Sequence, residues 1–295
     1  MENKKKIFLT GGGGFIGQNI LEQLGDKYEF VAPRSHDIDL TDSDKVEKLI
    51  KSFRPDIVIH AANLGGRRKD KNVKDVAYIN LKMFFNIIRC KKYFGRMIMF
   101  GTGAEYDKQF DIAGVKEDFF DTRIPNNQHG FYKYVCAKYA EQVDFITHLR
   151  IFGMFGKYEN FSLGFIANNI CRTLFDLPVS INQNVFFEYV FVNDFVKILD
   201  YFINNSGKEN FYNIGTGQRM SLLDIGNKIL KRSGKNLPIV VKQDGLNKEY
   251  TCNSERLRKE IPGLSFTLFE EAIGQLFLYY SGKIKDIKKE DILFD

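Results

Sequence analysis

Three tyrosines in the sequence are each followed, four residues later, by a lysine: Tyr78/Lys82, Tyr134/Lys138 and Tyr279/Lys283. On a helix this spacing puts both side chains on one face, one turn apart. A lysine ammonium favours the phenolate and lowers the pKa of the tyrosine, which suits a group that exchanges a proton with a carbonyl oxygen. About one or two such matches are expected by chance, so position must select among them.

Position favours the pair Tyr134/Lys138. The apolar spacing around Tyr78 is typical of packing, and Tyr279 lies near the C-terminus. Tyr134 comes after the predicted strand 96–101, which is followed directly by Thr102 at the edge of the sheet where open α/β folds bind ligands. We predict that Thr102, Tyr134 and Lys138 are catalytic, with Thr102 bonding the same substrate oxygen; the alternative is a plain surface pair.

A glycine-rich run, Thr10 to Gly17, directly follows the first predicted strand and opens a predicted helix. A pyrophosphate needs this arrangement, because backbone N–H groups must approach its oxygens and the helix dipole favours negative charge. The spacing fits both Gly12-x-Gly14-x-x-Gly17 and Gly11-x-x-Gly14-x-x-Gly17. The predicted dinucleotide contacts in this run are Gly11, Gly14, Phe15, Ile16 and Gly17.

The second predicted strand ends at Arg34-Ser35-His36, where a basic side chain would meet a ribose 2′-phosphate. We therefore predict that NADP(H) is preferred, with NAD(H) possible and a solvent-facing arginine as the alternative interpretation. Asp39 and Leu40 are expected on the adenine side, and Ala61 and Ala62 end the next strand with small side chains.

These residues are positioned by alternating strand-like and helix-like segments in the first half of the chain. The expected elements are 6–10, 15–24, 29–33, 44–53, 56–62, 73–93, 96–101, 132–145 and 147–152. Apolar strands such as 57–59 and 97–100 suit a sheet covered on both faces. We predict an α/β fold: a Rossmann-like, doubly wound parallel sheet over 1–155, rejoined by part of 186–217, with residues 156–295 forming mainly a smaller C-terminal substrate domain.

Composition excludes several classes of protein. Hydrophobic residues make up 44% of the 295, enough for a sizeable core, and the net charge of +6 is spread along the chain. We expect no nucleic-acid partner, no signal peptide in the opening residues 1–6 and no membrane span. Four separated cysteines and four histidines have no metal-ligand spacing, so the chain is expected to be cytoplasmic, reduced and metal-free.

Together these motifs resemble the extended short-chain dehydrogenase/reductases, the NAD-dependent epimerase/dehydratase family of nucleotide-sugar enzymes. Further matching segments are Asn80, Leu149 to Gly153, Val192-Asn193-Asp194 and Tyr212 to Gly217. The resemblance implies a catalytic set of Thr102, Tyr134 and Lys138. It also implies Lys138 and Asn80 at the cofactor, with Asn80 as a structural or relay residue, and a nucleotide sugar bound by the C-terminal part.

Within the family, residues 31–42 are most similar to GDP-fucose synthases and other NADPH-dependent 4-keto-sugar reductases. Dehydratases of the family have Asp-Glu after the catalytic Thr, whereas Gly103-Ala104 follows Thr102 here. The Cys and His with which GDP-fucose synthase epimerises C3 and C5 are absent at the matching positions, Ala104 and 160–163. The resemblance therefore implies simple hydride transfer at C4.

The remaining polar candidates for substrate contacts are Glu105, Tyr106, Asn160, Ser162, Arg172 and Arg219. The apolar helices expected at 73–93 and 132–145 suit the homodimer interface that relatives build, or burial within one subunit. We expect NADPH-dependent reduction at C4 of a nucleotide-linked 4-keto-6-deoxy sugar. The alternatives are a 4-epimerase with tightly bound NAD and a non-catalytic dinucleotide-binding protein.

Overall fold

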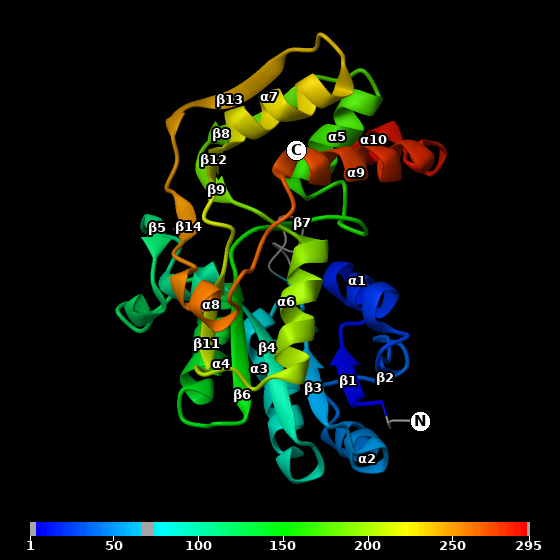
Figure 1. Cartoon of the computed structure of the whole chain (residues 1–295), viewed down its shortest axis with the longest axis vertical. Coiled ribbons are helices and arrows are strands. Elements are labelled where there is room, and N and C mark those ends of the chain that lie inside the picture. The colour runs from blue at the N-terminus through cyan, green and yellow to red at the C-terminus, as the bar shows by residue number, and fades with distance from the viewer. Residues whose placement is uncertain (1–3, 66–73, 294–295) are drawn as a thin grey trace.

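The computed structural model describes residues 4–65 and 74–293. A parallel sheet flanked by helices forms the lower part of the molecule in Figure 1, and a smaller group of helices and strands lies above it. Residues 1–3 and position 73, the expected start of a helix, lie outside the described residues.

The large sheet has six strands in the order β11-β6-β4-β3-β1-β2, and all its neighbouring pairs are parallel. They are β1 (Lys6–Thr10), β2 (Glu29–Val31), β3 (Ile57–His60), β4 (Arg96–Thr102), β6 (Ile146–Ile151) and β11 (Phe211–Ile214). This confirms the predicted doubly wound sheet. Its sixth strand, β11, comes from the range expected to rejoin the first domain.

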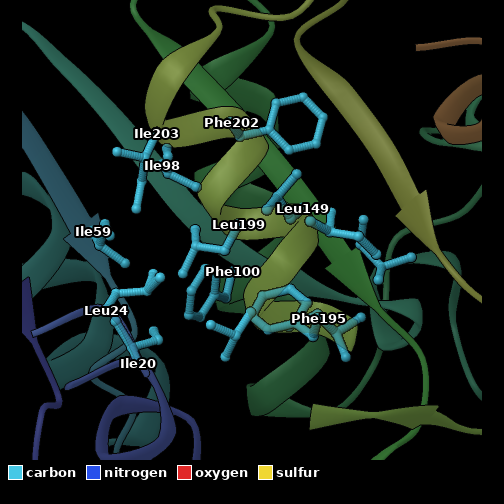
Figure 2. Close-up of a cluster of buried hydrophobic side chains, with 14 of the residues drawn as sticks. Ile20, Leu24, Ile59, Ile98, Phe100, Leu149, Phe195, Leu199, Phe202 and Ile203 are labelled. Carbon is cyan, nitrogen blue, oxygen red and sulfur yellow. The ribbon is translucent and has the colours of Figure 1, made fainter. Parts of the chain in front are cut away.

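Helices cover both faces of this sheet because its strands are apolar on both faces. Ile7 and Leu9 pack toward α1 (Phe15–Leu24) and α6 (Val192–Asn204), while Phe8 packs on the opposite side. That side is covered by α2 (Ser43–Phe53), α3 (Val76–Ile88) and α4 (Gln128–Ala140). Figure 2 shows the α6 side, where Phe195, Leu199 and Phe202 lie over the strand residues.

The predicted helix at 132–145 is observed as α4 from Gln128 to Ala140, so its predicted bounds were wrong by about one turn. The Asn127 side chain caps the helix by accepting a hydrogen bond of 2.8 Å from the Gly130 N–H. This cap starts the helix early and places His129 in its first turn. Similarly, α3 ends at Ile88, and Lys91–Tyr93 forms a short 3₁₀ helix, η2.

The smaller unit has its own core between helices and short strands. Its elements, with those of the connecting region, are β5 (Ile112–Val115), β7 (Met154–Phe155), α5 (Phe165–Leu174), β8 (Val179–Asn184), β9 (Phe186–Glu188), β10 (Val190–Phe191), β12 (Arg219–Ser221), α7 (Leu222–Ser233), β13 (Ile239–Leu246), β14 (Tyr250–Cys252), α8 (Glu255–Glu260), α9 (Phe269–Gly282) and α10 (Lys289–Ile292). The remaining 3₁₀ helices are η3 (Gly103–Tyr106), η4 (Glu117–Phe119) and η5 (Ile284–Asp286). In the described part of the chain, no helix has the length and apolar character needed to cross a bilayer.

Candidate active site

A cavity of about 1340 Å³ lies beyond the carboxyl ends of β1, β2 and β3. After β1 the chain moves outward to β2 and then returns to pair β3 on the other side of β1. This reversal of strand order opens a crevice at the edge of the sheet, the place where open α/β folds bind ligands.

The glycine turn forms one wall of this cavity. Gly11 has a φ of +74°, and a Cβ there would lie 2.8 Å from the backbone carbon of Ala61; a Cβ on Gly17 would lie 2.2 Å from the Gly11 carbonyl oxygen. Only glycine therefore lets the start of α1 pack against the turn and the turn against the end of β3. The resulting cradle exposes backbone to the cavity at a helix N-terminus, which fits a pyrophosphate.

Ten of the predicted cofactor contacts line the cavity: Gly11, Gly14, Phe15, Ile16, Gly17, Arg34, Asp39, Leu40, Ala61 and Ala62. Asn160, predicted as a substrate contact, lines the same cavity. Asn80 does not: its buried side chain accepts from Leu64 N (2.9 Å) and donates to the carbonyls of Leu64 and Val76. Asn80 therefore holds the loop after β3, so its bonds fit the structural role that the resemblance implies rather than a direct cofactor contact.

Thr102 ends β4 and is partly buried. Its Oγ1 accepts from Ala104 N (3.3 Å) and lies 3.1 Å from the hydroxyl of the buried Tyr250. Thr102 is not among the residues that line the cavity.

Tyr134 and Lys138 lie one turn apart on α4, as expected, but both side chains bond to carboxylates outside the helix. Tyr134 donates its hydroxyl hydrogen to Asp121, and Lys138 pairs with Asp121 (2.9 Å) and Glu141 (2.6 Å). The hydrogen bond to Asp121 raises the pKa of Tyr134 and outweighs the lowering by the Lys138 charge, so the net shift is opposite to the expected one. Neither residue lines the cavity.

Glu105 and Tyr106, predicted as substrate contacts, are buried in the core. Glu105 bonds Arg150 (2.7 Å) and His148 (3.0 Å), and Tyr106 donates to Asn213 (2.8 Å). Burial by itself would raise the pKa of Glu105, but His148 and Arg150 outweigh it and hold the pKa at about 2. The predicted substrate role is therefore corrected: Glu105 is the counter-charge of the buried Arg150.

The other three predicted substrate contacts are not brought together around the cavity. Ser162 donates its backbone N–H to Asn160, and the Arg172 guanidinium donates to the Pro178 carbonyl (2.6 Å). Arg219 pairs with Glu249 (2.7 Å) and lies over the Phe186 ring, 3.4 Å from its centroid.

Sequence reasoning missed several residues that line the cavity. Tyr158, Glu159, Leu163 and Gly164 also line the cavity, and no spacing in the sequence indicated them. Glu159 Oε2 is buried without a hydrogen-bond partner in the described chain, and burial raises the pKa of this carboxyl to about 8.

Sequence reasoning also missed the start of α4, whose first two turns contain His129 and Lys133. The Asn127 cap was the available signal, because asparagine before a helical segment favours a start at the next residue.

Residues 7–215 match the model of the NAD dependent epimerase/dehydratase family, and the chain therefore belongs to this family. Its members are nucleotide-sugar oxidoreductases and epimerases, which confirms the resemblance seen in the motifs.

Individual relatives agree with this assignment. The chain is 25% identical to a GDP-L-colitose synthase of Yersinia pseudotuberculosis over 255 residues, covering 78% of this chain and 82% of that protein. It superposes on a GDP-L-fucose synthetase from Naegleria fowleri bound to NADP with a TM-score of 0.85 and 17% identity, covering 98% and 96% of the two chains. It also superposes on the UDP-glucose 4-epimerase of Thermus thermophilus in complex with NAD, with a TM-score of 0.78 and 21% identity. That superposition covers 94% of this chain and 99% of the epimerase chain.

The cavity walls fit the nicotinamide dinucleotide that such proteins bind. The glycine cradle, which an added Cβ would fill, suits the pyrophosphate, and the small Ala61 and Ala62 leave room beside it.

Proposed function

We propose that the chain catalyses NADPH-dependent reduction at C4 of a nucleotide-linked 4-keto-6-deoxy sugar. The observation that carries the cofactor choice is Arg34, which lines the cavity just beyond β2. A guanidinium there suits a 2′-phosphate. The relatives named as GDP-L-colitose synthase and GDP-L-fucose synthetase support the choice of substrate class.

The chain's own residues hold and orient the reactants. The glycine turn binds the pyrophosphate, Arg34 binds the ribose phosphate, and Thr102 orients the sugar carbonyl. Bound NADPH supplies the hydride. No carboxylate takes the position after Thr102 that a dehydratase needs, and Glu105 is fixed by Arg150 and His148. Reduction is therefore favoured over elimination of water.

The test is incubation with GDP-, CDP-, UDP- and dTDP-linked 4-keto sugars plus NADPH, following the absorbance of reduced nicotinamide. We expect one sugar to be consumed together with NADPH. A purified protein that retains NAD, interconverts 4-epimers and consumes no cofactor would instead select the 4-epimerase.

Arg34→Ala tests the cofactor choice. Losing one charge-assisted contact should raise the KM for NADPH by about 10- to 100-fold and leave the KM for NADH unchanged. A wild-type preference for NADH would contradict the proposal.

We also propose that α3 and α4 form a homodimer interface. Tyr78 is 64% exposed, and Phe85 and Phe131 remain partly uncovered, although these helices pack on the sheet through their other faces.

A further inference from the structure

A second pair of side chains at helical i, i+4 spacing, His129 and Lys133, lies in the first two turns of α4. Lys133 is buried, and its ammonium donates to the Phe100 carbonyl on β4. The His129 ring packs edge-on against Tyr132 at 5.4 Å between centroids. His129 Nδ1 is buried and has no hydrogen-bond partner within the described part of the chain.

The neighbours of His129 on α4 contact both the cavity wall and the turn after Thr102. Tyr132 donates its hydroxyl hydrogen to Asn63 Oδ1, and Asn63 lines the cavity. Gly130 lies directly on η3, where an added Cβ would be 2.8 Å from the Ala104 carbonyl oxygen. The first turn of α4 therefore joins the cavity wall to the turn that follows Thr102.

Lys108 and Tyr250 connect the surroundings of His129 to Thr102. The Lys108 ammonium lies 4.3 Å from the centroid of the Tyr250 ring, and the Tyr250 hydroxyl lies 3.1 Å from Thr102 Oγ1. The positive charge of Lys108 also lowers the pKa of His129.

Tyr134 and Lys138 have different surroundings. Asp121 engages both of them on the exposed face of α4, and Glu141 takes a further contact of Lys138. Residues 129 and 133 are four apart and share a face, whereas residue 134 is rotated about 100° from residue 133. The face of α4 that turns toward η3 and β4 therefore carries an imidazole and a buried ammonium.

We propose that His129, rather than a tyrosine, exchanges the proton with the substrate oxygen, and that Lys133 is a positioning residue that tunes this imidazole. The inference rests on the proposed reduction. As hydride reaches the carbonyl carbon, the C=O π pair becomes a lone pair on oxygen. That oxygen takes the N–H proton of the imidazolium, leaving an alcohol and a neutral imidazole that regains its proton from solvent.

The charges around His129 set the direction of its pH dependence. Burial, helped by the charges of Lys133 and Lys108, lowers its pKa to about 4, and Glu105 opposes this lowering. Because the acid form falls about tenfold per pH unit above the pKa, the reduction rate should rise toward acidic pH. The oxidation of the alcohol, which needs the neutral ring, should lose rate as the pH falls toward 4.

The kinetic test compares His129→Gln with His129→Tyr, using Asn126→Ala in the preceding loop as a matched control. His129→Gln should lower kcat for reduction by about 10²- to 10³-fold, with the KM for NADPH nearly unchanged, and should abolish the rise toward acidic pH. His129→Tyr should restore part of kcat and move the loss of rate to alkaline pH, since a phenol titrates near pH ~10. An unchanged kcat in His129→Gln, or the large loss appearing in Tyr134→Phe instead, would overturn the inference.

A second readout does not depend on turnover. In histidine-labelled protein, the His129 resonance, assigned by its loss in His129→Gln, should shift on saturation with NADPH more than that of the core residue His148. Lys133→Gln, which keeps a donor for the Phe100 carbonyl, should move the His129 titration to higher pH. An unshifted His129 resonance would overturn the inference even if a sugar is reduced. A shifted resonance without turnover of any sugar would support the placement of His129 while the proposed substrate class fails.

Discussion

At the residue scale, Glu105 on η3 forms a buried charge network with Arg150 and His148 on β6. Arg150 is 1% exposed, and its guanidinium lies beside the stacked rings of Phe120 and Phe211, 4.3 and 4.7 Å from their centroids. A charge in such surroundings requires a partner, because removing one member leaves the other buried and uncompensated. A carboxylate three residues after Thr102 is therefore a core residue even though its sequence position suggested a ligand contact.

Glu105→Ala should lower the free energy of unfolding by about 3–5 kcal/mol, measured by urea denaturation at pH ~7. Because the folded pKa of about 2 lies below the ordinary value of 4.5, this stabilisation is present above pH 4.5 and is lost as the pH falls toward 2. The exposed Glu271→Ala on α9 is the control and should change stability little. A Glu105→Ala protein as stable as wild type at neutral pH would contradict this role.

At the element scale, the glycine turn forms the cavity wall because its backbone packs directly against neighbouring backbone segments. The turn brings β1, the start of α1 and the end of β3 within contact, and Thr10 Oγ1 joins them by accepting from Ala62 N (3.1 Å) and bonding His60 Nδ1 (2.9 Å). The spacing of the glycines predicts this turn because each close approach excludes a Cβ at a definite position.

Gly17→Ala and Gly13→Ala are a matched pair for this turn. A Cβ on Gly17 meets backbone at 2.2 Å, whereas a Cβ on Gly13 meets only the Arg34 side chain at 3.9 Å. Gly17→Ala should therefore lower the melting temperature and weaken NADPH binding at least about tenfold, and Gly13→Ala should leave the melting temperature nearly unchanged. Equal melting temperatures for the two variants would refute this interpretation of the turn.

The position at which α4 starts decides which titratable side chains belong to the helix. A helix beginning at residue 132 would exclude His129, and the Tyr-x-x-x-Lys pattern then points to Tyr134. The capped start at Asn127 instead brings His129 and Lys133 into the helix. Helix ends are poorly specified by apolar periodicity, since the first turn carries few core residues.

At the scale of the whole molecule, the uncovered side chains of α3 and α4 predict association. Tyr78→Glu combined with Phe85→Glu should convert a dimer to a monomer in size-exclusion chromatography with light scattering, because carboxylates are costly to bury in an apolar interface. Leu278→Glu on α9, where the leucine is 72% exposed, is the control and should leave the mass unchanged. A monomeric wild-type protein, or a double variant that stays dimeric, would refute the interface.

The sequence by itself determined the alternation of strands and helices, the family and the glycine turn with its neighbouring cavity residues. These follow from local patterns, because apolar periodicity and excluded Cβ positions act over a few residues. Only the tertiary structure decided that Glu105 is buried against Arg150, that Tyr134 is bonded to Asp121, and that His129 and Lys133 face η3 and β4. Each of these depends on partners distant in sequence and on the rotation of a helix, where a shift of one residue turns a side chain by about 100°.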